Sequence, residues 1–265
     1  MPIPMPMPMP MPMPSVLAFF AHPDDEALSA GGVLARHAAA GARTAVVTAT
    51  WTAGTRRAGE LADALEILGA GAPRLLGYAD ARVPSSAPGR PRWCDAPLDE
   101  AVGALVAQIR EFRPHVVITH DAYGGLTGHP DHVHAHRLAV LAVHAAGFGR
   151  LHPEAGDPWQ PTALWLATHP DSAAHDLGGY LLRPGRTVDS AYSVPDGMVT
   201  AVDVSPWVGQ KLAAIAAHRS EADRGAAPGR ITALAPALQK RVTGTEWYVR
   251  HHLAPTTGPD PSPTR

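Results

Sequence analysis

The stretch FFAHPDDEALSAGG, residues 19–32, decides the fold of this chain. An apolar, β-favouring run over residues 15–21 ends inside it and predicts a buried strand. The alanine- and leucine-rich residues 26–42 that follow predict a helix. Between the two, four ionisable side chains crowd around one proline: His22, Asp24, Asp25 and Glu26. Because neighbouring carboxylates repel one another, this turn is expected to hold a cation.

Predicted strands and helices alternate along the rest of the chain. Further strands are predicted at residues 44–50, 74–78, 115–121, 162–169 and 199–205, and further helices at 57–70, 98–112, 130–147 and 206–220. The Gly- and Pro-rich residues 171–198 carry no clear pattern. This alternation predicts an α/β, Rossmann-like fold, with a mainly parallel sheet and helices on both of its faces.

Both ends of the chain are expected to be disordered. Residues 1–14 alternate methionine and proline, which excludes a helix and gives no signal-peptide core. Residues 255–265 form a second such tail, which leaves residues 15–254 as a single domain. Since no apolar run approaches the roughly 18–20 residues that span a bilayer, we expect a cytoplasmic protein with no membrane partner.

Charge and cysteine content narrow the function classes. The formal net charge is −2 and no long run has one sign, which gives no support to a nucleic-acid partner. Cys94 is the only cysteine, so an intrachain disulfide or a thiolate metal cluster cannot form. Any metal must therefore be held by histidine and carboxylate side chains.

A second charged cluster, GHPDHVHAH at residues 128–136, follows the fourth predicted strand. In the usual doubly wound order the first and fourth strands are neighbours, and ligands bind at the carboxyl ends of such strands. The two clusters should therefore meet. His22 and Asp25, at i and i+3, with a third ligand from the second cluster, would form a zinc site open to water. Asp24, between the first two, is placed to act as a general base.

Each cluster also has a simpler interpretation. The acids of residues 24–26 could stabilise a helix start through its dipole. The histidines at 129, 132, 134 and 136 could form a solvated helix face. Because the two clusters occupy matching positions after two strands, a shared metal site is favoured over both of these simpler interpretations.

The two motifs, AHPDDE and GHPDHVHAH in this order, resemble those of the LmbE-like family, also called the PIG-L deacetylases. The Arg-x-x-Glu of residues 57–60, RLLGYAD at 74–80 and KLAAIAAHRS at 211–220 extend the resemblance over about residues 15–221. It implies an enzyme that hydrolyses a linear amide bond with one Zn²⁺ per chain, or another divalent metal. Its expected substrate is a small N-acylated, typically N-acetylated, amino sugar or glycoside, in secondary or thiol metabolism of the actinobacterial type.

The resemblance also implies roles for single residues. His22, Asp25 and His132 match the metal ligands, and Asp24 matches the general base.

Further residues match positions around the reacting group. His129 would stabilise the tetrahedral intermediate or protonate the leaving amine, and Asp131 would orient His129. Arg57 and Asp80 match contacts to sugar hydroxyls.

The chain departs from the family pattern in three places. Thr127 stands where some members carry a tyrosine, so Tyr123 is the candidate substrate-binding replacement. TWTAGTRR, residues 50–57, lacks an acidic Gly-Glu signature, which predicts a different acyl-amine substrate from the commonest ones. Glu221 replaces a usual glutamine, and His218 before it is either a helix-end or a functional residue.

Two rival functions remain open. One is an amidase acting on a thiol conjugate or on an acyl chain longer than acetyl, with the same metal and base. The other is a non-catalytic metal- or ligand-binding module. The presence of both Asp24 and His129 favours an enzyme, because a binding module needs no base.

Overall fold

The computed structural model describes residues 13–182 and 192–253. The predictions for the two tails therefore lie outside the described residues, apart from Met13 and Pro14. Among the residues described, none of the helices combines the length and the apolar character needed to cross a bilayer.

A seven-stranded sheet forms the centre of the protein, in the order β3-β2-β1-β4-β5-β7-β6. Its five parallel strands are β1 (Val16–Phe20), β2 (Thr44–Thr50), β3 (Arg74–Tyr78), β4 (Val116–His120) and β5 (Ala163–Thr168). The strand β7 (Thr245–His252) runs antiparallel to β5 and to the edge strand β6 (Thr200–Asp203). The predicted mainly parallel α/β sheet, with the first and fourth strands adjacent, is confirmed.

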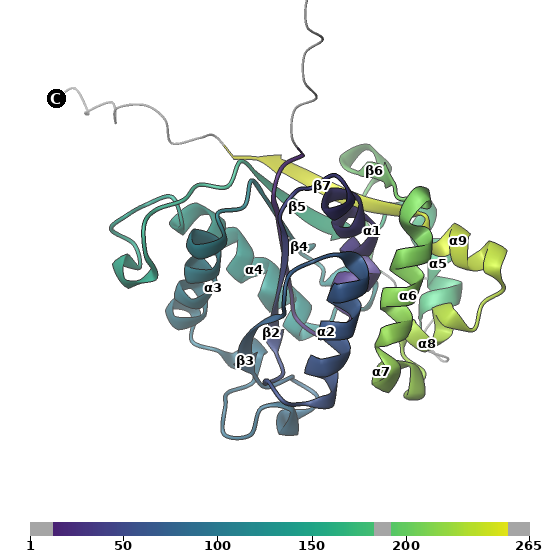
Figure 1. Ribbon diagram of the computed structural model, residues 1–265, viewed down its shortest axis with the longest axis horizontal. Coiled ribbons are helices and arrows are strands. Elements are labelled where there is room, and N and C mark those ends of the chain that lie inside the picture. Colours follow the sequence, from purple (N-terminus) through teal and green to yellow (C-terminus); the bar gives the residue numbers. More distant parts are fainter. Residues whose placement is uncertain (1–12, 183–191, 254–265) are drawn as a thin grey trace, which may run out of the picture.

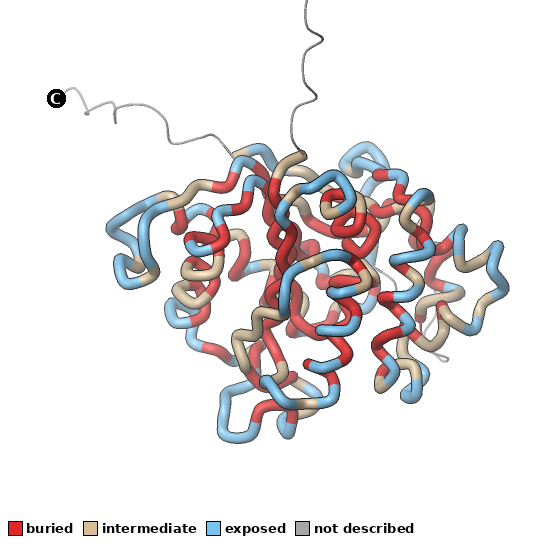
Figure 2. The backbone as a smooth tube through the Cα atoms, in the orientation of Figure 1, coloured by how far each residue is buried: buried red, intermediate tan, exposed pale blue. Residues whose placement is uncertain are grey.

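Helices cover both faces of this sheet (Figure 1). One face carries α1 (Asp25–Ala39), α2 (Arg56–Leu68) and α6 (Val208–Ala217), and the other carries α3 (Leu98–Phe112) and α4 (Pro130–Ala145). The buried residues follow the sheet and the inner sides of these helices (Figure 2). This agrees with apolar strands that are buried on both faces.

Local signals set the helix ends near the predicted positions. Thr55 caps α2 by accepting a hydrogen bond from the Ala58 N–H, and Gly69 ends it in the left-handed conformation. Pro130 takes the first position of α4, where a missing N–H costs nothing.

The C-terminal part differs from the prediction. The helix predicted at 206–220 breaks at His218, between α6 and the short α7 (Arg219–Asp223). The unassigned region contains α5 (Asp171–Leu181), and α8 (Ala227–Thr232) and α9 (Pro236–Thr243) follow α7. The strand β7 was not predicted, because its buried side includes the charged Glu246.

Glu246 joins β7 to α1. Its carboxylate accepts hydrogen bonds from the Gly32 and Val33 N–H groups, at 2.7 and 2.9 Å, and pairs with the buried Lys211 Nζ at 2.7 Å. A Cβ at Gly32 would lie 2.4 Å from the Val204 Cβ, so this close approach requires glycine. These contacts fix the helix whose first turn carries the charged cluster.

Candidate metal centre and active site

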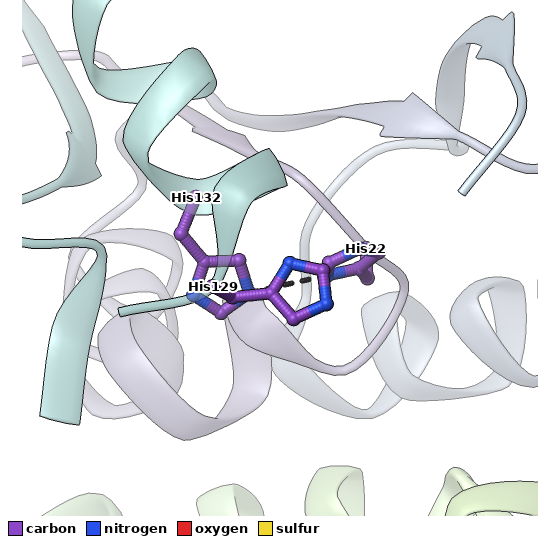
Figure 3. Close-up of side chains that lie close together, drawn as sticks. All are labelled: His22, His129 and His132. Carbon is purple, nitrogen blue, oxygen red and sulfur yellow. Dashed lines mark hydrogen bonds between the residues drawn. The ribbon is translucent and has the colours of Figure 1, made fainter. Parts of the chain in front are cut away.

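The two charged clusters meet at the carboxyl edge of β1 and β4, which pair directly in the sheet. His22 to Asp25 form the turn from β1 into α1, and His129 to His132 form the first turn of α4. The rings of His22, His129 and His132 converge from these two elements (Figure 3).

Three side chains are spaced as metal ligands would be. His22 Nδ1 lies 3.1 Å from His132 Nε2, and the two oxygens of the Asp25 carboxylate each lie 3.3 Å from one of these nitrogens, Oδ2 from His22 Nδ1 and Oδ1 from His132 Nε2. Ligands at about 2.0–2.1 Å from a tetrahedral zinc ion are separated by about 3.3 Å. The spacing and the nitrogen and oxygen chemistry of the three donors therefore both fit a zinc-sized ion.

Each of these histidines is fixed through its other ring nitrogen. His22 Nε2 lies 3.0 Å from Asp131 Oδ2, and His132 Nδ1 lies 3.2 Å from the Gly124 carbonyl oxygen. Such partners set the tautomer and leave the facing nitrogens available to a metal.

The electrostatics show what a metal would replace. Burial lowers the pKa of His22, but hydrogen bonds to Asp131 and Asp25 outweigh it and raise that pKa to about 10. Without a metal, the carboxylates therefore keep His22 protonated at neutral pH. A metal ion that binds His22 must displace this proton.

His120, at the end of β4, belongs to the same cluster and was missed from the sequence. Its ring stacks on His132 with centroids 3.9 Å apart, and its Nε2 accepts the Ala21 N–H. It lies 3.4 Å from the Asp25 carboxylate, and Asp25, His120 and His132 form a further group able to hold a metal. Its position at the carboxyl end of a predicted strand was the only sequence signal.

Asp24 lies beside the proposed ligands in an unusual backbone conformation, with φ 125° and ψ −28°. Its carboxylate accepts a hydrogen bond from Arg57 at 3.1 Å. Burial raises the pKa of Asp24 to about 7, although Arg57 acts in the opposite direction. A carboxylate with a pKa near neutrality suits a general base.

The carboxylate of Asp131 lies nearer to His22 than to His129. Its Oδ2 lies 4.0 Å from His129 Nδ1 but only 3.0 Å from His22 Nε2, and it also accepts the Ala81 N–H at 2.9 Å. His129 Nδ1 instead accepts the backbone N–H of Asp131 at 3.2 Å, so the His129 hydrogen resides on Nε2. Burial, His22 and Arg82 lower the pKa of His129 to about 4.

The two expected sugar contacts are largely engaged within the protein. Arg57 is 4% exposed, and its guanidinium contacts Asp24, Glu221 and the Pro23 carbonyl and lies over the Trp51 ring. Asp80 Oδ1 accepts the backbone N–H groups of residues 82 and 83.

A cavity of about 440 Å³ opens onto this site. The residues predicted for the site that line it are His22, Asp24, Asp25, Arg57, Asp80, His129 and His132. Asp131 does not line the cavity and contacts His22 Nε2. Tyr123 is half-exposed and does not line the described cavity either. Its ring stacks on Tyr192, with centroids 5.5 Å apart. The C-terminal part contributes an apolar portion of the cavity wall, made by Leu181, Leu182, Ile231, Val242 and Trp247. It also contributes charged side chains, among them Lys211, Glu221 and Arg224.

Comparison with known proteins adds independent findings. The family described as PIG-L, GlcNAc-PI de-N-acetylase, matches residues 17–143. A 1D-myo-inositol 2-acetamido-2-deoxy-alpha-D-glucopyranoside deacetylase from Rhodococcus erythropolis is 38% identical over 244 residues, which cover 78% of this chain and 80% of that protein.

Solved structures share the fold. A conserved protein from Thermus thermophilus is 28% identical, with a TM-score of 0.63, covering 89% of this chain and 94% of that one. An N,N'-diacetylchitobiose deacetylase from Pyrococcus horikoshii is 20% identical, with a TM-score of 0.60, covering 92% of this chain and 87% of that one.

Proposed function

The chain belongs to the PIG-L family, and from this premise we propose that it is a zinc-dependent N-deacetylase acting on an N-acetylglucosamine glycoside. The observation that carries the proposal is the arrangement of His22, Asp25 and His132, with donors 3.1–3.3 Å apart and Asp24 beside them. A zinc ion held there supplies Lewis-acid activation of a water molecule and of the amide carbonyl.

Asp24 takes the proton of the attacking water. Its carboxylate lines the cavity next to the three donors and does not belong to them. The water oxygen bonds to the amide carbon, the C–N bond breaks, and the proton passes to the departing nitrogen. Acetic acid and a free amine result, and at neutral pH the acid passes its proton to the amine.

His129 is proposed to donate a hydrogen bond to the oxyanion of the tetrahedral intermediate. Since its Nδ1 accepts a backbone N–H, Nε2 carries the hydrogen and serves as a neutral donor. Of the two roles expected from the resemblance, this geometry supports oxyanion stabilisation.

The proposed substrate class follows from the relatives. The Rhodococcus erythropolis protein is named for an N-acetylated glucosamine joined to inositol. We infer that this chain accepts such a glycoside or a close analogue, a small molecule rich in hydroxyl groups.

The apolar portion of the cavity wall favours a second candidate, an amidase for a longer acyl chain. Side chains such as Leu182, Ile231 and Val242 offer no hydrogen bonds to a sugar but would bury methylene groups.

A turnover assay tests both candidates. Amine release is measured from N-acetylglucosaminyl-inositol, from N-acyl analogues of increasing chain length and from a thiol conjugate, with Asp24→Asn as the control. Preferential release from the acetylated glycoside supports the first candidate, and a preference for long acyl chains supports the second. Metal binding without release from any of these amides would refute enzymatic function for this site.

A further inference from the structure

The conformation of Asp24 must be held by its surroundings. A non-glycine residue at φ 125° lies in a strained region, and such strain persists only where neighbouring contacts fix it. Two chains of contacts reach Asp24, one to its backbone and one to its carboxylate. Both begin in the segment His218–Glu221.

The first chain reaches the backbone. The Asp24 N–H donates to Glu26 Oε2 at 2.9 Å, and the other oxygen of Glu26 lies 2.7 Å from His218 Nε2. Glu26 and His218 are both fully buried. His218 therefore fixes the carboxylate that accepts from the strained peptide group.

The second chain reaches the carboxylate. Glu221 Oε1 lies 3.0 Å from Arg57 Nη1, and Arg57 Nη2 donates to Asp24 Oδ1 at 3.1 Å. Glu221 is itself 4% exposed. An Arg held on both sides by carboxylates has little rotational freedom, so Glu221 fixes the direction of the Asp24 side chain.

The segment is anchored to α2. Ser220 donates from its backbone N–H and its hydroxyl to the buried Glu60 carboxylate, at 2.9 and 2.5 Å. His218 and Ser220 do not line the described cavity, and their hydrogen bonds lead to Glu26 and Glu60 and not to the proposed metal ligands. They can affect the reaction only through other residues.

We propose that His218 and Glu221 are positioning residues that jointly set the backbone and the carboxylate of the base Asp24. The expected effect on kcat rests on the proposed function, but the expected effect on the conformation of Asp24 does not. The segment lies almost two hundred residues from Asp24 in the sequence, which is why the AHPDDE motif alone does not reveal it.

The test compares His218→Ala, His218→Gln and Glu221→Ala with the wild type. A glutamine amide can replace the Nε2–H donor of His218. Arg219→Ala is the matched control, because Arg219 lies in the same segment but forms an exposed ion pair with Asp63, on the surface. Turnover, KM and metal content per chain are measured for each folded protein.

His218→Ala is expected to lower kcat about 10- to 100-fold, since small displacements of a catalytic group cost that much. KM and metal content should stay unchanged, His218→Gln should recover most of the rate, and Arg219→Ala should match the wild type. An unchanged kcat in His218→Ala, or a loss of metal instead, would overturn the proposal. If His218→Ala does not fold, Glu221→Ala tests the second chain of contacts. Because Glu221 also lines the cavity, kcat must fall with KM unchanged, and an unchanged kcat or a raised KM alone would overturn the proposal.

A structural measurement separates this inference from the proposed function. Crystal structures of the wild type and His218→Ala give the φ angle of Asp24 whether or not the substrate is known. The angle should leave the region near 125° in the variant, and a wild-type angle would overturn the positioning role. Absence of turnover in the wild type would refute the proposed function alone.

Discussion

Removal of the Asp131 carboxylate should weaken metal binding, because this carboxylate lies 3.0 Å from His22 Nε2 but 4.0 Å from His129 Nδ1. In Asp131→Ala, the Ala81 N–H loses its acceptor, and His22 Nε2 loses its nearer carboxylate, which leaves Asp80 Oδ2 at 3.5 Å. In Asp131→Asn, one amide oxygen at the Oδ2 position can still accept from both. The Asn NH₂ would then take the place of Oδ1, which is buried without a hydrogen-bond partner among the described residues.

The expected magnitude follows from these contacts. Loss of a carboxylate partner behind a metal-binding histidine typically costs about 10- to 100-fold in metal affinity, or about 1.4–2.7 kcal/mol. The asparagine variant keeps both hydrogen bonds but loses the charge, and a charge-assisted bond is about twice as strong as a neutral one. Its loss should therefore be about 3- to 10-fold.

The assay is competition for Zn²⁺ against a chromogenic chelator, repeated across pH. The proton on His22 competes with the metal, and Asp131 helps to raise the pKa of His22 to about 10. Removing Asp131 lowers this pKa, so near neutral pH the wild type must displace a more tightly held proton than the variant. The difference in apparent zinc affinity between the wild type and Asp131→Ala should therefore be smallest near neutral pH and should increase at alkaline pH. Asp95→Asn, an exposed charge change, serves as the control.

One result would refute the reasoning. If Asp131→Ala bound zinc as tightly as the wild type throughout this pH range, Asp131 would not support His22. A change confined to the pH profile of turnover would instead favour the role predicted from sequence, in which Asp131 orients His129.

Four further outcomes are expected. His132→Ala should lose most of its zinc in elemental analysis after dialysis against a chelator, because two protein ligands remain; a full equivalent at the same site would contradict the ligand assignment. Asp24→Asn should keep its zinc and lose about 10²- to 10⁴-fold in kcat, whereas near-normal turnover would place the base elsewhere. Glu246→Ala should lower the free energy of unfolding in urea by about 3–5 kcal/mol, since it leaves the buried Lys211 charge unpaired; a loss below about 1 kcal/mol would argue against this pair. Burial lowers the pKa of His169 from 6.5 to about 4, so the unfolded chain binds a proton there that the folded protein does not. Stability should therefore decrease as pH falls from about 6.5 to about 4, and a His169→Gln variant should lose part of that dependence in pH-dependent unfolding experiments.

Much of the site's location was predictable from the sequence. Parallel strands place their carboxyl ends at one edge, and the adjacency of the first and fourth strands follows from the doubly wound order. The two motifs at these strand ends were therefore enough to bring His22 and Asp25 close to His132.

The orientations within the site were not predictable. Asp131 is two residues from His129, but at the start of α4 its carboxylate lies against the turn after β1. Tyr123 stacks on Tyr192, a partner from a distant loop that no local pattern reveals. The burial of Glu246 had no local sequence signal, because its partners, Lys211 and the backbone of α1, come from remote parts of the chain.

The place of β7 in the sheet has a consequence for synthesis on the ribosome. β6 pairs with β7 alone among the described strands, and β7 also covers the outer edge of β5. A nascent chain that has not yet released residues 245–252 therefore holds β6 without a neighbour and β5 with an open edge. Open strand edges recruit other chains, so the chain is exposed to aggregation during this period of its synthesis. Ribosome stalling before residue 245 should lengthen the period and increase chaperone binding to the nascent chain.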